Sequence, residues 1–499
     1  MASNTLSTPS EPTQTLGGSR KLTLVDAVAQ SVGFMGPVFS IAFLVPLLVG
    51  MNASGKGAGV AAPLSVLIAA VGVLGLGWIV SQYAKRIHAA GSLYDYVTDG
   101  LGNRLGVAAG FLYYLGILAL GAGILVLIGG TIYDTVEAEF NVTPLPRPVW
   151  DLILFVIVAV VLYLGVALST RAQLVLALLS LTAVFIFAIY LIVKVGSANH
   201  VEKAFRPSSS PQGFNGVLFG VLYGVLLFTG FETAANLGEE TAHPKRDIPR
   251  AVIISVLAIA GFYIITSYAQ VAGYHFDLGA IGKNASAPLF GLAGPSSGGG
   301  FGSVTVRRLL ELVVIFDMIA VLIGCSVAAS RGFFALARDK HLPRAVARVS
   351  RRGTPLVAGC VVLALYLATI LVTHAWGGLV AQKGTPHYAA IFNWGSTFGS
   401  FALSVIYLLM SVGALRGLRA HTRPVQLWLA ATVGIVVTGA AIFGAVYKVS
   451  APIIYAPWVA LGVFVVGLIV SVVTPSRASG PEQSSFAGLA PGEQGAVRL

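Results

Sequence analysis

Two carboxylates lie inside runs of apolar residues that are long enough to cross a bilayer. Glu232 directly follows Phe228-Thr229-Gly230-Phe231, and Asp317 stands between Phe316 and Met318 in a later run. A charged side chain at membrane depth costs about 3 kcal/mol or more, so each acid is a candidate functional group. Glu232 is interpreted as a proton-titrating or gating acid, or alternatively as a structural acid that ties its helix to a neighbour. Asp317 could pair with a cationic substrate, bind an ion, or hydrogen-bond within the bundle.

Two of the apolar runs contain residues that interrupt a helix. The first run includes Gly33-Phe34-Met35-Gly36-Pro37, where Pro37 lacks the N–H that the carbonyl of Gly33 would need. Gly230 lies near the middle of the run that carries Glu232, and glycine is a weak helix former. Irregular backbone at membrane depth persists only inside protein or beside a cavity. The pair of interruptions therefore predicts a substrate site made of half-helix ends and freed carbonyls, with a simple proline kink in the first run as the alternative.

The elements that position these residues are predicted from composition. The chain has 499 residues, of which 56% are hydrophobic and only 10% are charged, whereas soluble domains carry about 25% charged residues. The apolar runs are too long for barrel strands and lack their alternation, which favours helices. We predict an all-α integral membrane protein with twelve spans, at 24–50, 59–81, 105–131, 150–168, 172–195, 214–238, 250–274, 306–332, 355–374, 389–414, 426–446 and 453–473.

The basic residues predict the orientation. With the N-terminus in the cytoplasm, 21 of the 31 Lys and Arg residues fall on the inner side and 31 − 21 = 10 on the outer side. The positive-inside rule then places both termini in the cytoplasm. Basic loops beside an anionic leaflet account for the net charge of +12 without a nucleic-acid partner. Residues 1–22 and 475–499 are polar and are predicted to be disordered cytoplasmic tails around a membrane domain at 23–474.

Several classes of protein are disfavoured by what the sequence lacks. Cys325 and Cys360 both fall in apolar runs, so no disulfide framework is expected. A phosphate-binding loop is absent, which argues against ATP-driven pumping by this chain. No polar segment is long enough for a catalytic domain, so we expect neither an enzyme nor a bound cofactor or metal. The lipid bilayer is the expected environment.

Three motifs stand in or beside the predicted spans. The first is the loop after the second span, with basic residues before Gly91-Ser92 and then Tyr94-x-Tyr96. The second joins Gly230-Phe231-Glu232 to Glu239-Glu240-x-x-x-Pro-x-x-x-Ile-Pro-Arg. The third is Arg331-x-x-x-Ala-x-Ala-Arg-Asp-x-x-x-Pro, which ends at Pro343. These motifs resemble those of the amino acid–polyamine–organocation (APC) permeases, and the resemblance covers about residues 22–475. It implies a LeuT-type fold of two inverted five-helix repeats, at 24–195 and 214–414, with two extra helices at 426–473.

The resemblance also implies a function. It is secondary transport of an amino acid or a related amine across the plasma membrane by alternating access, with a proton or another ion as the coupling partner. The implied substrate site is backbone near Gly33–Val38 and Phe228–Phe231, and the candidate coupling residues are Glu232, Asp317 and Ser180. In full, the substrate-site residues are Gly33, Phe34, Met35, Gly36, Val38, Phe228, Thr229, Gly230 and Phe231.

The chain departs from the family pattern at three of these places. An acid at Asp317 is not general in the family, and Ser180 stands where several members have a lysine. The alternative for Ser180 is a hydroxyl that bonds its own helix. The first interruption has fewer small residues than the Gly-Ser-Gly run of many relatives and one fewer N–H donor, which puts recognition of an α-carboxylate in doubt.

Other functions remain open alternatives. Asp317 and Glu232 together would supply the counter-charge for a polyamine or another cationic amine, and exchange of amino acids is a further possibility. A sensor that binds without transporting, or a channel, would be a different class, although few spans show the polar stripe of a pore.

The sequence also predicts three local structures. The loop after the second span is interpreted as an interfacial amphipathic helix whose tyrosines lie at the headgroups. Thr23 and Asp26 fit a capping box at the start of the first span. Arg307 and Glu311 have the spacing of a structural ion pair on one helix face.

Overall fold

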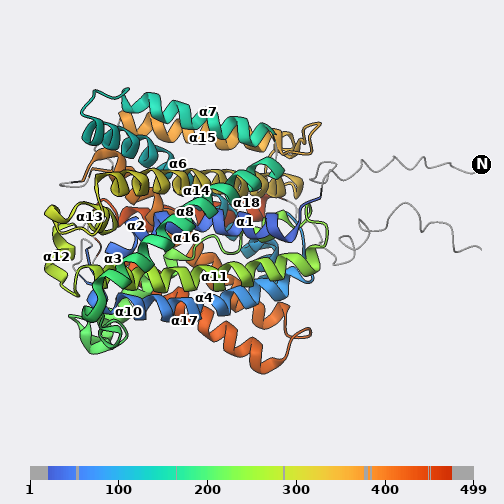
Figure 1. The fold of residues 1–499 in the computed structure, drawn as a ribbon. Helices are drawn as coiled ribbons and strands as arrows, with labels where there is room; N and C mark the ends of the chain where they lie inside the picture. The colour runs from blue at the N-terminus through green and yellow to red at the C-terminus, as the bar shows by residue number, and fades with distance from the viewer. Residues whose placement is uncertain are drawn as a thin grey trace, which may run out of the picture.

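The chain is built from helices that run in both directions through one bundle (Figure 1). A computed structural model describes residues 21–51, 56–164, 166–284, 287–375, 380–381, 385–447, 449 and 451–474. The predicted tails lie outside the described residues except for Lys21 and Leu22. The α-helices are α1 Leu24–Met35, α2 Pro37–Phe43, α3 Val45–Val49, α4 Ala62–Ala84, α5 Leu93–Leu101, α6 Asn103–Phe140, α7 Arg147–Leu164, α8 Val166–Val195, α9 Val201–Ala204, α10 Gly213–Leu227, α11 Pro244–Gly273, α12 Leu278–Lys283, α13 Pro288–Ala293, α14 Val304–Arg338, α15 Leu356–Ala375, α16 His387–Gly417, α17 Pro424–Val446 and α18 Tyr455–Val473.

The predicted membrane fold class is confirmed. Within the described residues, ten helical segments are long and apolar enough to span a membrane, and two shorter apolar helices bring the number to 10 + 2 = 12. Some helices extend past the predicted spans: α6 continues to Phe140, α11 begins at Pro244, and α14 ends at Arg338. The sequence prediction followed hydropathy, which marks only the lipid-crossing part of a helix, whereas polar residues continue the helix beyond it.

The bundle has a buried centre and an apolar outer surface. α1, α6 and α14 bury most of their side chains, and α6 packs against α14, α16 and α18. α7 and α15 pack together along one edge of the bundle in Figure 1. α7 exposes Leu152, Val156 and Val160 there, as expected for a surface that faces lipid.

The first span is divided at Gly36. Gly36 adopts the left-handed conformation, with φ 54°, and both ends α1 and precedes α2, which begins at Pro37. A Cβ at this position would collide with the side chain of Val321 on α14. Glycine is therefore required here both for its backbone conformation and for the close approach of α14.

The span that carries Glu232 is divided as well. α10 ends at Leu227, and a short 3-10 helix at Thr233–Leu237 continues beyond Gly230, whose φ is 109°. A Cβ on Gly230 would collide with the ring of Phe34 from the first interruption. The two interruptions expected from the sequence are thus present, and they are in direct contact.

The segment after α4 forms a helix, but its tyrosines do not lie at a lipid surface. α5 packs between α6 and α16, and Tyr94 and Tyr96 are buried. Tyr96 stacks on Tyr83 with ring centroids 5.0 Å apart, and the Tyr94 hydroxyl donates to Asp339. The prediction of tyrosines at the headgroups was therefore wrong, because α5 buries them against α6 and α16 of its own bundle.

Two predicted side-chain pairs are observed. Thr23 and Asp26 form the capping box of α1, in which each side chain bonds the other's backbone N–H. Arg307 Nε donates to Glu311 Oε1 over 2.9 Å on α14. Both Cys325 and Cys360 are free thiols.

Candidate functional site

The two interruptions are joined by hydrogen bonds as well as by the contact between Phe34 and Gly230. Ser31 Oγ on α1 donates to the carbonyl of Phe231 over 2.8 Å and accepts from the N–H of Ala234 over 3.1 Å. Thr233 Oγ1 donates to the carbonyl of Gly230 over 2.7 Å. Backbone groups that the broken helix leaves without partners are thereby paired inside the protein, as membrane depth requires. One hydroxyl of α1 therefore bridges the break in the other span.

Glu232 is a fully buried acid whose oxygens are both bonded. Tyr113 on α6 donates its hydroxyl to Oε1 over 3.1 Å, and Tyr407 on α16 donates to Oε2 over 2.6 Å. The N–H of Gly230 donates to Oε2 over 3.2 Å. Hydrogen bonds to a charged group are stronger than neutral ones. Glu232 thus ties the broken span to two other spans.

Asp317 is also fully buried, but only one of its oxygens is bonded. Oδ2 accepts from the N–H groups of Val38 over 2.9 Å and Phe39 over 2.8 Å. These are the first free donors of α2, so the carboxylate of α14 caps this half-helix across the bundle. Oδ1 has no hydrogen-bond partner among the described residues. A buried acceptor without a partner is costly and requires an explanation.

Ser180 on α8 hydrogen-bonds to the helix that carries Asp317. Its hydroxyl is directed to the carbonyl of Leu176 on its own helix, over 2.8 Å, and to that of Val313 on α14, over 3.0 Å. Val313 lies one helical turn before Asp317 on α14. This geometry matches the alternative of a hydroxyl bonded within the helices.

The other predicted residues surround the two interruptions. Phe228 caps α10 and packs edge-on against Tyr263, with ring centroids 5.1 Å apart. The Phe231 ring lies 5.5 Å from that of Tyr407. The carbonyl of Met35 accepts from Ser40 Oγ over 3.1 Å. Gly33 and Phe34 are buried in α1, and Thr229 is half-buried.

Several polar residues at this place were not predicted as site residues. The hydroxyls described above belong to Ser31, Tyr113 and Tyr407. A fourth hydroxyl, that of Tyr263, donates to the carbonyl of Leu227 over 2.6 Å. Two amides, Gln30 on α1 and Gln270 on α11, are buried, and the side-chain oxygen of each has no partner within the described part of the chain. The signal that could have identified them is a polar side chain in the interior of an apolar span.

Several buried oxygen acceptors lie on the helices around the breaks. Gln30, Gln270 and Asp317 each have a side-chain oxygen with no partner in the described ranges, and a hydrogen-bond donor could satisfy such atoms. Within the described ranges, no group of three or more His, Cys, Asp or Glu side chains is placed to hold a metal ion.

Ion pairs join α14 to the segment after the second break, at the end of the bundle where α1 begins. Arg331 Nε lies 2.6 Å from Glu240 Oε1, and both side chains are buried. Arg338 Nη1 lies 2.6 Å from Glu239 Oε1, which also accepts from the N–H of Ala90 over 2.9 Å. The acidic and basic residues of two of the sequence motifs therefore bind each other.

Two further features lie at this end of the bundle: the backbone hydrogen bonds of Leu22 and the buried carboxyl of Asp95. Leu22 exchanges backbone hydrogen bonds with the segment at Glu240 and Ala242, which fixes the start of α1. Asp95 on α5 lies near Asp339 and Arg338. Burial, followed by the negative charge of Asp339, raises the pKa of Asp95 to about 8, and the positive charge of Arg338 opposes the rise.

Comparison with known proteins gives one family and several relatives. The family model described as "Amino acid permease" matches residues 31–475. The branched-chain amino acid permease BcaP of Lactococcus lactis is 26% identical over 67% of this chain and 72% of that protein. BcaP of Bacillus subtilis is 23% identical over 61% of this chain and 66% of that protein. The vacuolar cationic amino acid transporter 4 of Arabidopsis thaliana is 28% identical over 70% of this chain but only 58% of that protein.

Solved structures share the fold. The Eremococcus coleocola manganese transporter, in complex with an aromatic bis-isothiourea substituted compound, superimposes with a TM-score of 0.54 and 14% sequence identity. The match covers 90% of this chain and 93% of that chain. At this identity, the likeness bears on the arrangement of helices alone.

Proposed function

Because the chain belongs to the amino acid permease family, we propose that it is a proton-coupled secondary transporter that moves an amino acid or a related amine by alternating access. One observation carries the proposal: two interrupted spans meet, and each break is bonded to a buried acid. The first break is bonded to Asp317 of α14, and the second is bonded to Glu232 of its own span. Transporters of this kind hold substrates at the midplane between broken helices. The family and the fold support transport rather than catalysis.

The substrate lies beside the two breaks, at backbone near Gly33–Val38 and Phe228–Phe231. Its ammonium group is bound by Asp317 Oδ1, the carboxylate oxygen that has no partner within the described residues. Binding there would satisfy a buried acceptor and neutralise a buried charge at once, and both changes are favourable. The unpaired carbonyl oxygens of Gln30 and Gln270 add to the preference for a cationic group.

Glu232 is the coupling acid. In its charged form it accepts from Tyr113 and Tyr407, and so joins the broken span to α6 and α16. A proton on Glu232 removes the charge that strengthens these bonds. Protonation would therefore release the break from two other spans, which is the change that alternating access needs. Ser180 has a positioning role between α8 and α14.

The end of the bundle that holds the Arg331–Glu240 and Arg338–Glu239 pairs faces the cytoplasmic side of the plasma membrane. Exposed Arg344, Arg348 and Arg351 lie in the segment after α14 at this end, as the positive-inside rule requires. The ion pairs would then close the inner entrance in the conformation described here, and they must separate for substrate release.

Counterflow in proteoliposomes tests transport directly. Vesicles are preloaded with a mixture of neutral amino acids and the entry of the same labelled amino acids is followed. Accumulation that saturates with concentration supports a carrier. Binding of labelled amino acid without accumulation would contradict transport and support a sensor, and non-saturable flux would support a channel.

A second candidate is a carrier for an amine that lacks a carboxylate, such as a polyamine. The specific observation is that the backbone N–H groups of Val38 and Phe39 already donate hydrogen bonds to Asp317 Oδ2. In related folds the N-terminus of such a half-helix points at the substrate carboxylate. Preloading with putrescine distinguishes the two: accumulation of putrescine alone would favour the amine carrier, and accumulation of neutral amino acids alone would exclude it.

A further inference from the structure

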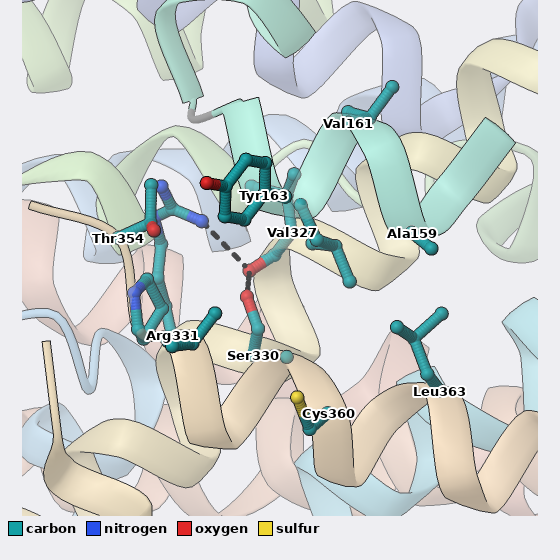
Figure 2. Close-up of a pocket in the computed structure, with 13 residues that line it drawn as sticks. Ala159, Val161, Tyr163, Val327, Ser330, Arg331, Thr354, Cys360 and Leu363 are labelled. Carbon is teal, nitrogen blue, oxygen red and sulfur yellow. Dashed lines mark hydrogen bonds between the residues drawn. The ribbon is translucent and has the colours of Figure 1, made fainter. Parts of the chain in front are cut away.

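A cavity of about 160 Å³ lies between α7, α14 and α15, away from the two interruptions. Apolar side chains of α7 and α15 form its walls, and Figure 2 shows Val161, Val327 and Leu363 around it. Ser330, Arg331 and Thr354 stand at its polar end. The cavity is thus apolar along most of its length and polar at one end, like the boundary between an acyl chain and a headgroup.

The cavity opens at the outer surface of the bundle. α7 and α15 form one edge of the molecule in Figure 1, and α7 buries little of its own surface. Tyr163 and Leu356 line the cavity and are exposed. Because these helices cross the membrane, the molecules that contact this opening are lipids.

The polar end of the cavity adjoins a strongly basic segment. Residues 340–355 contain five Lys or Arg residues and no acid. Arg352 is exposed, and its guanidinium lies over the ring of Tyr163 at 4.9 Å from the centroid. This contact holds a positive charge at the mouth of the cavity. Clusters of four to eight basic residues beside a membrane span attract anionic lipids, and basic pockets between spans bind their headgroups.

We propose that this cavity is a binding site for an anionic phospholipid, with an acyl chain between α7 and α15 and the phosphate on Arg352. Tyr163 holds the Arg352 guanidinium in place, and Arg351 adds a second positive charge beside it. Arg331 lines the polar end but is held by Glu240 and by the carbonyl of Val327, as Figure 2 shows for the latter. The exposed arginines, rather than Arg331, therefore supply the charge for the headgroup. The proposal does not depend on which substrate is transported.

The two cysteines provide a direct probe of occupancy. Cys360 lines the cavity and is exposed, whereas Cys325 is buried in α14. A lipid chain in the cavity would cover the Cys360 thiol. Alkylation of Cys360 by N-ethylmaleimide then reports whether the cavity is filled, and alkylation of Cys325 reports unfolding.

The full chain is placed in nanodiscs of phosphatidylcholine alone or of phosphatidylcholine with phosphatidylglycerol. We expect phosphatidylglycerol to slow alkylation of Cys360, and Arg352→Gln to weaken this protection about fivefold, the effect of one basic residue at an anionic surface. Arg419→Gln, an exposed arginine in the segment between α16 and α17, should leave the protection unchanged. Gly359→Val, which fills the cavity wall beside Leu162, should slow alkylation in both lipids.

Four results would overturn the proposal. One is the same alkylation rate in both lipids, and another is protection that Arg352→Gln and Arg419→Gln affect equally. The third is protection by glycerophosphate in phosphatidylcholine nanodiscs that equals the protection by phosphatidylglycerol, which would indicate a site for a free phosphate. Protection that depends on protein density in vesicles but not on headgroup would identify a contact between copies of the chain and would equally exclude the lipid.

Discussion

Glu232 and Asp317 are both fully buried carboxylates beside a broken helix, yet their surroundings differ. Glu232 accepts three hydrogen bonds, which use both of its oxygens. Asp317 accepts two, both on Oδ2, and its Oδ1 has no partner among the described residues. A satisfied acid holds elements together, whereas a half-satisfied acid in a low-dielectric site attracts a positive group. This difference is the basis of our proposal that Asp317 binds the substrate and that Glu232 couples the helices.

The largest effect is expected from Asp317→Asn. This change keeps the shape and an acceptor for α2 but removes the charge that binds the ammonium group. Loss of one partner of a buried charge pair should lower substrate affinity about 100-fold. Affinity is measured from the concentration dependence of counterflow, and thermal unfolding in detergent reports whether the variant is folded. Glu232→Gln is the matched control, with affinity within about threefold of the natural chain because no substrate contact is lost.

Glu232→Gln should instead remove the pH dependence of uptake. An amide cannot take up the proton that would loosen the bonds to Tyr113 and Tyr407. Uptake at saturating substrate is compared from mildly acidic to mildly alkaline pH. Asp317→Asn should keep the pH profile of the natural chain. A Glu232→Gln variant with an unaltered pH profile would remove Glu232 from coupling.

Loss of either tyrosine hydroxyl should affect stability rather than affinity. Tyr407→Phe should lower the free energy of unfolding by about 2 kcal/mol, as for other hydrogen bonds to charged groups. Tyr113→Phe should cost less, because its bond to Glu232 is 3.1 Å long, against 2.6 Å for Tyr407. Unfolding of the two variants is compared in the same detergent. A drop in substrate affinity as large as that of Asp317→Asn would show that Glu232 contacts the substrate.

Asp95 tests the same contrast outside the membrane spans. Like Asp317 Oδ1, its Oδ2 is buried and has no hydrogen-bond partner among the residues that the structure describes. Its pKa is about 8 in the fold against an ordinary 3.8, so the folded state holds the proton more tightly than the unfolded state. Stability from this group is therefore present at low pH and is lost as pH rises from about 4 to about 8. Asp95→Asn should flatten the change of unfolding temperature with pH in that window. An unchanged slope would mean that Asp95 is already ionised in the fold.

The smallest effect is expected at Ser180. Its hydroxyl bonds two backbone carbonyls and no acid, so Ser180→Ala should cost about 1 kcal/mol of stability or less. Counterflow rates should equal those of the natural chain. A loss of coupling in this variant would restore the role that the sequence suggested for this position.

The fold and the two helix breaks followed from the sequence, but the side-chain contacts around the breaks did not. Apolar runs identified the spans, and Gly36, Pro37 and Gly230 identified the breaks, since these residue types change backbone geometry wherever they stand. Which groups meet across the bundle depends on packing between helices distant in sequence. For that reason the tyrosines on Glu232 and the capping of α2 by Asp317 could not be predicted. Packing also explains the wrong prediction for the tyrosines of α5, since an amphipathic segment can pack on protein as well as on lipid.

The most direct test of the account compares two analogues of the transported amino acid as competitors in counterflow. With leucine as substrate, 3-methylbutylamine keeps the ammonium group without the carboxylate, and 4-methylpentanoate keeps the carboxylate without the ammonium group. We expect the amine to compete in the natural chain and to lose competition in Asp317→Asn, while the carboxylate competes in neither. Competition by the carboxylate that is equal or stronger in Asp317→Asn, with no competition by the amine, would contradict this expectation.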